Sequence, residues 1–406
     1  MNLSLFISKR ITAAAQGGFS STIHKIAVVT ITVGLGAAIV SFLIMQGFQE
    51  TIKNKIYSFS AHLLVTKFTM NNSTEEQPFF YNIDLFNHPE KFPMVTHLQE
   101  YSHKPGLIKT PDEAMGVIFK GVGMSFDTVR FAENMVDGHF ISFPDTAYSN
   151  EIVVSKIIAD KLALNIGDKI VVHFFQNPPR FRRLQVKGIY ETNLSEYYDT
   201  KIILGDLRLV QRLNEWADSV AGGIQVYIKD PEHAEEALVA IGESMDYDLY
   251  IEKTSDTFVQ VFEWLALVNR QVVILLGIIL TVVCVNMISV VLILVMERVQ
   301  MVGMLKALGA RDGMIRYVFI HSGIRLILRG LLYGNIIGLG ICFLQDKYKF
   351  LKLNAHDYYM SYVPIGWSVE TVLILNVLVF VVVTIVLLLP TAIVARIRPI
   401  SAIRFD

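Results

Sequence analysis

The sequence is short of charged residues and of cysteine. Asp, Glu, Lys and Arg make up 18% of its 406 residues, whereas about 25% is typical of soluble domains. The shortage is concentrated in a few long uncharged runs, so it indicates membrane spans and not a uniformly apolar globule. The two cysteines, Cys284 and Cys342, both lie in such runs, which argues against a disulfide framework.

Motifs for catalysis, metal binding and nucleic-acid binding are absent from the sequence as well. There is no G-x-x-x-x-G-K-[ST] loop to hold ATP, no H-E-x-x-H and no paired C-x-x-C. The 10 histidines are scattered without ligand spacing, and neither the net charge of -1 nor a basic tract indicates nucleic acid. We therefore predict a non-enzymatic membrane subunit without a cofactor of its own, which depends on a separate partner subunit to bind and hydrolyse ATP.

Four long apolar runs, the third of which contains arginines, predict four membrane helices. Gln271–Met296 alone is long enough, at about 1.5 Å per residue, to cross a bilayer core of about 30 Å. The run 26–48 follows Lys25 as in a signal peptide, but it is too long for one and lacks an A-x-A-like cleavage site, so an uncleaved helix is expected. The complete plan is an amphipathic segment at 1–25, membrane helices at 26–48, 269–296, 316–345 and 370–395, a connecting segment at 297–315, an outer loop at 346–369 and a tail at 396–406.

The basic residues outside these spans predict the orientation of the chain. Three clusters fall on the same side of a four-span protein, namely Lys9, Arg10 and Lys25; Arg298, Lys306, Arg311 and Arg316; and Arg396, Arg398 and Arg404. Short loops rich in Lys and Arg remain in the cytoplasm. The segments 1–25, 297–315 and 396–406 are therefore predicted to be cytoplasmic, and 49–268 and 346–369 to be periplasmic.

The segment 49–268 is predicted to be a mixed α+β domain inserted between the first and second membrane helices. Short alternating or apolar runs bounded by turn residues predict strands, and capped amphipathic runs predict helices. Strands are expected at 60–68, 115–122, 151–154, 169–175, 184–190, 202–204, 223–229 and 248–252, and helices at 155–164, 206–213 and 231–245. The polar stretch 71–93 is expected to be a loop, and a helix from Asp256 is expected to continue into the second span.

The third span has two unusual features. Arg325 and Arg329 interrupt it, four residues apart on one face and near its cytoplasmic half. They either snorkel to the cytoplasmic headgroups or contact a lipid phosphate or an acidic residue of a neighbouring helix. Beyond them, Gly330, Gly334 and Gly338 form a stripe of small residues, which predicts close packing against another helix of the bundle.

A short amphipathic segment follows the second span. Glu297 and Arg298 end the uncharged run, and apolar residues then alternate with basic ones up to Gly309, which is a typical helix stop. The pattern predicts a short helix at the membrane face. Such a helix either docks in a groove of a soluble partner or is an ordinary connector between two spans.

The same residues resemble those of a known family. The pattern N-x-I-S … M-E-R-x-x-x-[IVM]-x-x-L-K-A-L-G-A, from Asn286 to Ala310, is similar to that of the ABC-transporter permeases of the FtsX and MacB type, which include the lipoprotein-releasing permeases of LolC and LolE type. The resemblance implies that the short helix is a coupling helix, which contacts a cytoplasmic LolD-like ABC ATPase. The residues expected at this contact are Glu297, Arg298, Met301, Leu305, Lys306, Leu308 and Gly309.

Other stretches resemble the lipoprotein-releasing branch of this family, among them 47–50, 59–62, 152–174 and the tail 398–404. The outer domain of that branch is of the MacB-like periplasmic core type and carries a hook between two strands, which holds a soluble lipoprotein carrier. The loop 176–183 stands at this position here. The residues expected to bind a LolA-like carrier are Gln176, Pro178, Pro179, Arg180, Phe181, Arg182 and Arg183, and a plain basic hairpin tip is the alternative.

The resemblance implies the permease subunit of an ABC complex in the bacterial inner membrane, which extracts lipoproteins and passes them to the carrier. A second permease subunit, identical or homologous, is expected because four spans cannot enclose a cavity alone. The acyl chains of the substrate are expected to contact Val33, Val40, Leu43 and Ile44 of the first span, with membrane lipid around the bundle. The alternatives are a MacB-like efflux or mechanotransmission permease, an FtsX-like signalling scaffold for cell-wall hydrolysis, and a membrane enzyme.

Overall fold

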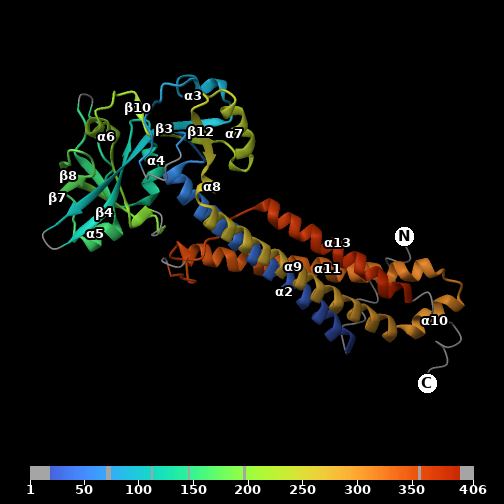
Figure 1. Cartoon of the computed structure of the whole chain (residues 1–406). Coiled ribbons are helices and arrows are strands. Elements are labelled where there is room, and N and C mark those ends of the chain that lie inside the picture. Colours follow the sequence, from blue (N-terminus) through green and yellow to red (C-terminus); the bar gives the residue numbers. More distant parts are fainter. Residues whose placement is uncertain are drawn as a thin grey trace. The chain divides into compact units, whose positions relative to one another are not determined.

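The structure, a computed structural model, describes residues 19–69, 75–110, 113–144, 147–194, 198–354 and 358–393. The predicted tail 396–406 and most of the predicted amphipathic segment 1–25 lie outside these residues. The chain divides into two compact units (Figure 1). The first, called the bundle, comprises Met1–Glu50, Trp264–Lys352 and Tyr362–Asp406, and the second, called the mixed unit, comprises Thr51–Glu263 and Leu353–Ser361.

Four long helices provide the frame of the bundle. They are α2 (Phe19–Ser60), α9 (Val259–Glu297), α11 (Asp312–Tyr348) and α13 (Val369–Ile393). Each contains a stretch that is long and apolar enough to cross a membrane, in agreement with the four predicted spans. Because α2 continues to Ser60, the strand expected from that residue begins later, and the helix expected to be continuous from Asp256 is interrupted at Phe258, between α8 (Thr254–Thr257) and α9.

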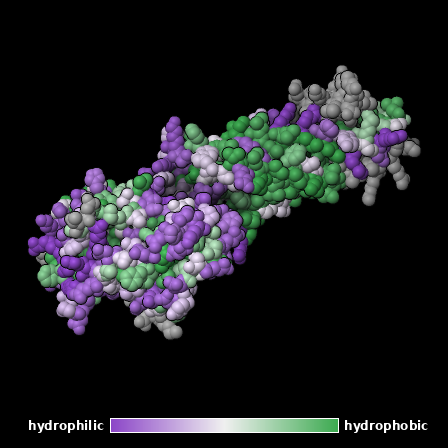
Figure 2. All heavy atoms as spheres, turned by 90° about the horizontal axis from the view of Figure 1, so that it is seen from above, coloured by the Kyte–Doolittle hydropathy of each residue, from purple (hydrophilic) through white to green (hydrophobic). Residues whose placement is uncertain are grey.

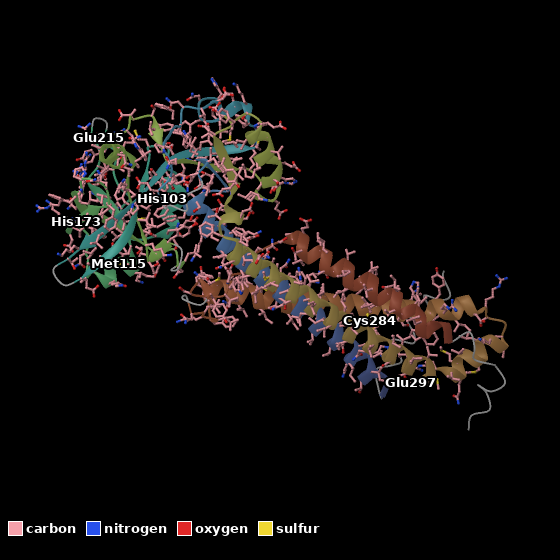
Figure 3. All side chains as sticks on the ribbon, viewed as in Figure 1. His103, Met115, His173, Glu215, Cys284 and Glu297 are labelled. Carbon is pink, nitrogen blue, oxygen red and sulfur yellow. The ribbon has the colours of Figure 1, made fainter. Side chains whose placement is uncertain are left out.

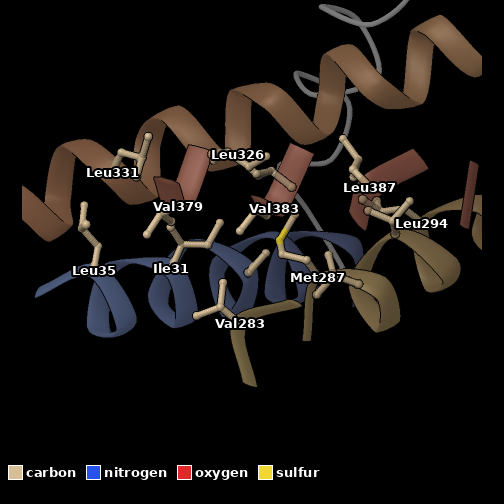
Figure 4. Close-up of a cluster of buried hydrophobic side chains, with 14 of the residues drawn as sticks. Ile31, Leu35, Val283, Met287, Leu294, Leu326, Leu331, Val379, Val383 and Leu387 are labelled. Carbon is tan, nitrogen blue, oxygen red and sulfur yellow. The ribbon is translucent and has the colours of Figure 1, made fainter. Parts of the chain in front are cut away.

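Apolar residues that recur every three or four positions along each helix form the core of the bundle (Figure 4). On α2, Ile31, Leu35 and Ile39 are almost completely buried. They belong to one cluster with Val283, Met287 and Leu294 of α9, Leu326 and Leu331 of α11, and Val379, Val383 and Leu387 of α13. The outer surface of these helices is apolar too, and Figure 2 shows it as a hydrophobic band, which suits contact with lipid chains.

The glycine stripe of α11 packs closely against α2, as the small-residue spacing predicts. The contacts pair Gly330 with Ile31, Gly334 with Leu35, and Gly338 with Gly36 and Ile39. A Cβ atom added to Gly338 would lie 3.1 Å from the backbone of Gly36, so a larger residue there would push the two helices apart. The pairs also show that α2 and α11 run side by side in the same direction, because Gly330 with Ile31, Gly334 with Leu35 and Gly338 with Ile39 keep the same offset between their residue numbers.

The mixed unit is built around a ten-stranded sheet. Its strands are β1 (Leu63–Lys67), β3 (Val95–Lys109), β4 (Ala114–Val122), β5 (Met135–Gly138), β6 (Glu151–Ser155), β7 (Lys169–Phe174), β8 (Arg180–Tyr190), β9 (Ile202–Asp206), β11 (Gly223–Ile228) and β12 (Leu249–Lys253). The order is β12-β1-β11-β3-β4-β9-β6-β8-β5, and β7 pairs with both β3 and β8. The strands β3, β4, β9, β6, β8 and β7 thus close into a ring. Phe119, Val172 and Val186 of these strands belong to one apolar core.

Helices and short segments cover this sheet. They are α5 (Lys156–Lys161), α6 (Leu207–Asn214), α7 (Ala234–Gly242), the short α3 (Asp84–Asn87) and α4 (Thr128–Phe131), the 3-10 segments η1 (Pro89–Lys91), η2 (Ala132–Asn134) and η4 (Pro231–His233), and a separate pair of strands, β2 (Phe79–Phe80) and β10 (Val220–Ala221). The stretch 71–93 is therefore not simply a loop, since β2, α3 and η1 occupy part of its described residues. The Oγ of Ser155 accepts a hydrogen bond of 3.1 Å from the backbone N–H of Ile158, which confirms the predicted helix cap, although α5 ends at Lys161 and not near Leu164.

Candidate functional site

The predicted coupling segment contains a short helix between α9 and α11. α9 ends at Glu297, and Arg298 leaves the helical conformation with φ of -109° and ψ of 18°. The helix α10 then spans Val299–Ala307. Gly309 follows with φ of 85°, a left-handed conformation that glycine adopts without steric cost and that ends helices. The short helix and its glycine stop are therefore confirmed.

The apolar outer face of α10 differs from the expected one. Val302 is fully buried, and Leu305 packs against the bundle core, so Leu305 holds α10 to the bundle and does not face outward. The exposed apolar residues at this end of the bundle are Met296, Met304 and Leu308, and Leu308 is 85% exposed. Met304 and Leu308 are four residues apart, which places them on one side of α10 and its last turn, whereas Met296 belongs to α9, before the break at Arg298.

The remaining residues predicted at this contact have different surroundings. Glu297 is exposed at the end of α9 (Figure 3), whereas Arg298 and Met301 are half-buried. The Nζ of Lys306 forms an ion pair of 2.8 Å with Oδ1 of Asp312. Asp312 begins α11, so this pair links α10 to the start of the next long helix.

The predicted hook is a tight hairpin, and half of it is strand. β7 ends at Phe174 and β8 begins at Arg180, with Arg180 opposite Phe174, Phe181 opposite His173, Arg182 opposite Val172 and Arg183 opposite Val171. Only residues 175–179 form the tip. The expectation of a protruding loop over 176–183 is therefore wrong for its second half. Pro178 and Pro179, which cannot donate to a ladder, confine the break to the turn, and the chain pairs again directly after them.

Two residues of the predicted hook are fixed to the end of α6. The guanidinium of Arg180 donates to the backbone oxygen of Leu213 at 2.9 Å and forms an ion pair with the carboxylate of Glu215. The side-chain amide of Gln176 donates to the same Leu213 oxygen at 3.2 Å. The last carbonyls of a helix carry partial negative charge, so Arg180 neutralises the end of α6 and is not available to a partner.

The outward side of the hairpin presents a compact surface of aromatic and basic groups. Phe181 is 66% exposed, Phe175 is 61% exposed, and Arg183 is exposed as well. The ring of Phe181 lies 6.1 Å from that of His173 on the neighbouring strand, which is labelled in Figure 3. Arg182 points to the opposite side of the strand, because side chains alternate along it. We call Phe175, His173, Phe181 and Arg183 the hairpin face.

The residues predicted to line a substrate cavity divide between the surface and the core of the bundle. Val33 is 62% exposed, and Val40 and Ile44 are half-buried, so these three lie toward one outer side of α2. Leu43, by contrast, is completely buried in the helix-packing core. It is one position out of phase with the helical stripe to which Val33, Val40 and Ile44 belong. The assignment of Leu43 to an open cavity is therefore wrong.

An open groove lies between α2 and α9 in the bundle. Its volume is about 510 Å³, and its lining includes Ile23 and Ile26 of α2 and Val282, Val285 and Ile293 of α9. The groove also contains Asn286, whose side-chain oxygen is buried without a hydrogen-bond partner in the described part of the chain. This groove was not predicted from the sequence, because α9 contributes most of its lining and the predicted cavity residues all belong to the first span. Over the described ranges, no group of three or more His, Cys, Asp and Glu residues could hold a metal ion.

Comparison with known proteins identifies the class of this protein. The family described as MacB-like periplasmic core domain matches residues 26–243, and the family described as FtsX-like permease C-terminal matches residues 273–399. The first match covers more than half of the chain. The chain therefore belongs to the FtsX- and MacB-type permeases.

Within this class, the chain is similar to proteins of lipoprotein-releasing systems. It is 21% identical to the lipoprotein-releasing system transmembrane protein LolC of Neisseria meningitidis, over 97% of each chain. It is 24% identical to LolC of Haemophilus influenzae, over 100% of this chain and 99% of that protein. Among solved structures, the periplasmic region of MacB from Actinobacillus actinomycetemcomitans matches 53% of this chain and 98% of that chain, with 13% identity and a TM-score of 0.35.

Proposed function

We propose that this chain is the permease subunit of an ABC complex that extracts lipoproteins from the inner membrane and passes them to a periplasmic carrier. The observation that carries this proposal is the similarity to LolC proteins along the entire chain. It is supported by four apolar helices long enough to cross a membrane and by a large mixed unit, most of which, Thr51–Glu263, lies between the first two of them in the sequence.

The proposed orientation places α10 in the cytoplasm and the mixed unit in the periplasm. All four long helices cross the membrane. The basic residues Arg298, Lys306, Arg311 and Arg316 surround α10 and its flanking turns, and clusters of this kind stay in the cytoplasm. An ATPase can then reach α10, while a lipoprotein carrier can reach the hairpin face.

The coupling helix would transmit ATP-driven movement to the bundle. Met304 and Leu308 enter an apolar groove of the ATPase, in the manner of an amphipathic helix docking into a partner. Val302 and Leu305 fix α10 to the bundle core, and the ion pair between Lys306 and Asp312 connects it to α11. A displacement of α10 therefore moves the ends of α9 and α11 with it.

Substrate and carrier would contact two different surfaces. A second permease subunit faces the outer side of α2, where Val33, Val40 and Ile44 contact the acyl chains between the two subunits. The carrier binds the hairpin face, where Phe181 supplies an apolar anchor and the guanidinium of Arg183 a forked donor for carbonyl or carboxylate groups. Arg180 is not part of this face, because its guanidinium is bound to the end of α6.

A reconstituted release assay tests the proposal. The chain, its second permease subunit and the partner ATPase are placed in proteoliposomes with a lipid-modified protein, and its ATP-dependent transfer to soluble carrier is measured. Met304→Ser with Leu308→Ser should prevent co-purification of the ATPase and abolish transfer, because both apolar side chains are exposed in the isolated permease. Leu305→Ala is the control, which should lower the thermal stability of the permease by about 2 kcal/mol or more while ATPase contact is retained.

A second pair of variants separates the carrier contact from the coupling contact. Phe181→Ser with Arg183→Ser should reduce carrier binding and transfer about tenfold, with ATPase co-purification unchanged. Arg180→Ala should leave carrier affinity nearly unchanged because its guanidinium is bound to α6. Transfer without ATP, or normal transfer by the Met304 and Leu308 variant, would contradict the proposed function.

A further inference from the structure

We infer that Arg325 and Arg329 of α11 bind the phosphate group of an anionic phospholipid from the cytoplasmic leaflet. The inference uses the orientation of the bundle given under the proposed function, but it concerns a site that neither coupling nor carrier binding employs. Three observations about α11 support it, namely that the two charges have no anionic partner among the described residues, that they lie at a defined depth in the bundle, and that an apolar surface continues from them.

The two arginines have no anionic partner among the residues that the structure describes. No ion pair of the described chain includes either of them. The Nε of Arg325 donates to the backbone oxygen of His321 at 3.3 Å, while its Nη2 is buried and has no hydrogen-bond partner within the described ranges. Like charges four residues apart on a helix repel each other, and unpaired charge within a membrane helix is costly. A bound anion would remove both costs.

The packing of α11 on α2 fixes the depth of the pair. Gly330 lies beside Ile31 and Gly334 beside Leu35. Continuing the same offset toward the start of both helices places Arg325 level with Ile26, the first residue of the uncharged run of α2, and Arg329 one turn deeper, about 6 Å farther along the helix. The pair therefore stands at the cytoplasmic boundary of the apolar region, where lipid phosphates lie.

An apolar surface extends from the arginines toward the middle of the bundle. Leu332 and Ile336 are 59% and 60% exposed, and they follow Arg329 by three and seven residues, on the same side of α11. The glycines of α11 face α2, so this side faces outward. A phospholipid with its phosphate at Arg325 and Arg329 can therefore lay an acyl chain along Leu332 and Ile336. The guanidinium forks suit the oxygen atoms of a phosphate better than a point charge does.

Lipid retention by the purified full-length chain tests this inference. The protein is transferred into nanodiscs of phosphatidylglycerol and phosphatidylcholine in equal amounts, extracted with mild detergent, and the lipids that remain bound are counted by native mass spectrometry. The wild type should retain phosphatidylglycerol in preference to phosphatidylcholine. Arg325→Gln with Arg329→Gln should lower this preference about tenfold, the loss of roughly one charge-assisted contact. The control is Arg316→Gln with Lys347→Gln, which also removes two positive charges from α11. This variant should retain the preference for phosphatidylglycerol.

Additional measurements separate the competing explanations. If the double variant does not fold, judged by its melting temperature in phosphatidylcholine, the exposed Arg329→Gln alone should give a partial loss of preference. Equal retention of phosphatidylglycerol by wild type and variant overturns the inference. If inorganic phosphate displaces the lipid, the inference is overturned and the arginines bind a free anion. If permease dimers dissociate when the arginines are replaced, in pure phosphatidylcholine, the inference is also overturned, and the arginines contact a carboxylate of the second subunit. Because neither ATPase nor carrier is present, failure of lipoprotein transfer would not affect this result.

Discussion

The bundle and the mixed unit bury different kinds of groups. The bundle core consists of apolar side chains and close glycine contacts, with reciprocal hydrogen bonds of 2.7 and 3.0 Å between the side-chain amides of Asn335 and Asn376 joining α11 to α13. The mixed unit buries ionisable groups, and Lys120, Asp199 and Asp206 are each only 1% exposed. Shape complementarity therefore decides the stability of the bundle, whereas paired polar groups contribute to that of the mixed unit.

Lys120 shows how the mixed unit accommodates a buried charge. Its ammonium donates to the backbone oxygen of Phe59, in the last turn of α2, and lies 4.5 Å from the centre of the Phe59 ring. The side-chain amide of Gln225 donates to the same oxygen at 3.1 Å. A cation at the C-terminal end of a helix is favoured by the helix dipole. Burial nevertheless lowers the pKa of Lys120 to about 7, against an opposing effect of Glu76.

The largest effect is expected from a steric change in the bundle. Gly338→Leu places a side chain where even a Cβ atom lies 3.1 Å from the backbone of Gly36. Because the two nearest atoms belong to the backbone of Gly36 and the next one is the Cβ of Ile39, which cannot rotate away, the helices α2 and α11 must separate. Overpacking of this kind costs about 3 kcal/mol, and the loss appears as a lower melting temperature of the purified full-length protein.

Gly340→Leu is the matched control for this change. It lies two residues further along α11, and a Cβ atom there meets nothing within 4 Å. Both variants add the same side chain to the same helix, so intrinsic helix propensity does not distinguish them. Equal melting temperatures for the two variants would show that shape is not what holds the bundle together.

A smaller, pH-dependent effect is expected from Lys120 in the mixed unit. Its pKa is about 7 in the folded protein, against an ordinary value of 10.5. Between these two values the unfolded chain holds a proton that the folded chain has lost, so stability must rise with pH in this window. Relative to Lys120→Met, the wild type should gain about 2 kcal/mol between roughly pH 7 and 9, measured as unfolding free energy at each pH.

The exposed Lys109 provides the control, since Lys109→Met removes the same charge from the surface of β3. The difference between wild type and Lys109→Met should not change over the same pH range. If the wild type gained no stability with pH relative to Lys120→Met, the bond to Phe59 would keep the ammonium charged despite its burial. The bundle and the mixed unit would then differ less in how pH affects their stability than their buried groups indicate.

The difference between the apolar core of the bundle and the partly polar core of the mixed unit explains which elements could be predicted from the sequence. In the bundle, long apolar runs identified all four helices, and glycine spacing predicted a close helix contact of α11, because apolar surroundings leave a simple pattern. In the mixed unit, β3 escaped prediction. Its residues Gln99, Ser102 and Lys104 are almost completely buried, so no alternation of apolar and polar residues marks it as a strand.

At the candidate sites, the sequence predicted where the functional segments lie but not which of their side chains are exposed. The short helix α10 could be located by Glu297 and Gly309, but which of its sides faces outward depends on how it packs, and Leu305 lies inward while Met304 is exposed. The hairpin could be located from its prolines. Its arginines looked equivalent, yet Arg180 is bound to α6 and Arg183 is exposed, because strand pairing sends neighbouring side chains to opposite sides.

The smallest effect is expected at the surface of the mixed unit, where Glu215 combines two opposing contributions. Its side chain pairs with Arg180 but is 75% exposed, and such pairs contribute at most about 1 kcal/mol. Its backbone has φ of 59° at the end of α6, a left-handed conformation that costs a residue other than glycine about 1 kcal/mol.

Glu215→Ala keeps this strain and loses the pair, so it should lower the free energy of unfolding by about 0.5 kcal/mol. Glu215→Gly loses the pair but relieves the strain, so its free energy of unfolding should exceed that of Glu215→Ala by about 1 kcal/mol. If the two variants unfold together at the same denaturant concentration, backbone strain at this helix end is negligible and the exposed pair alone sets the stability there.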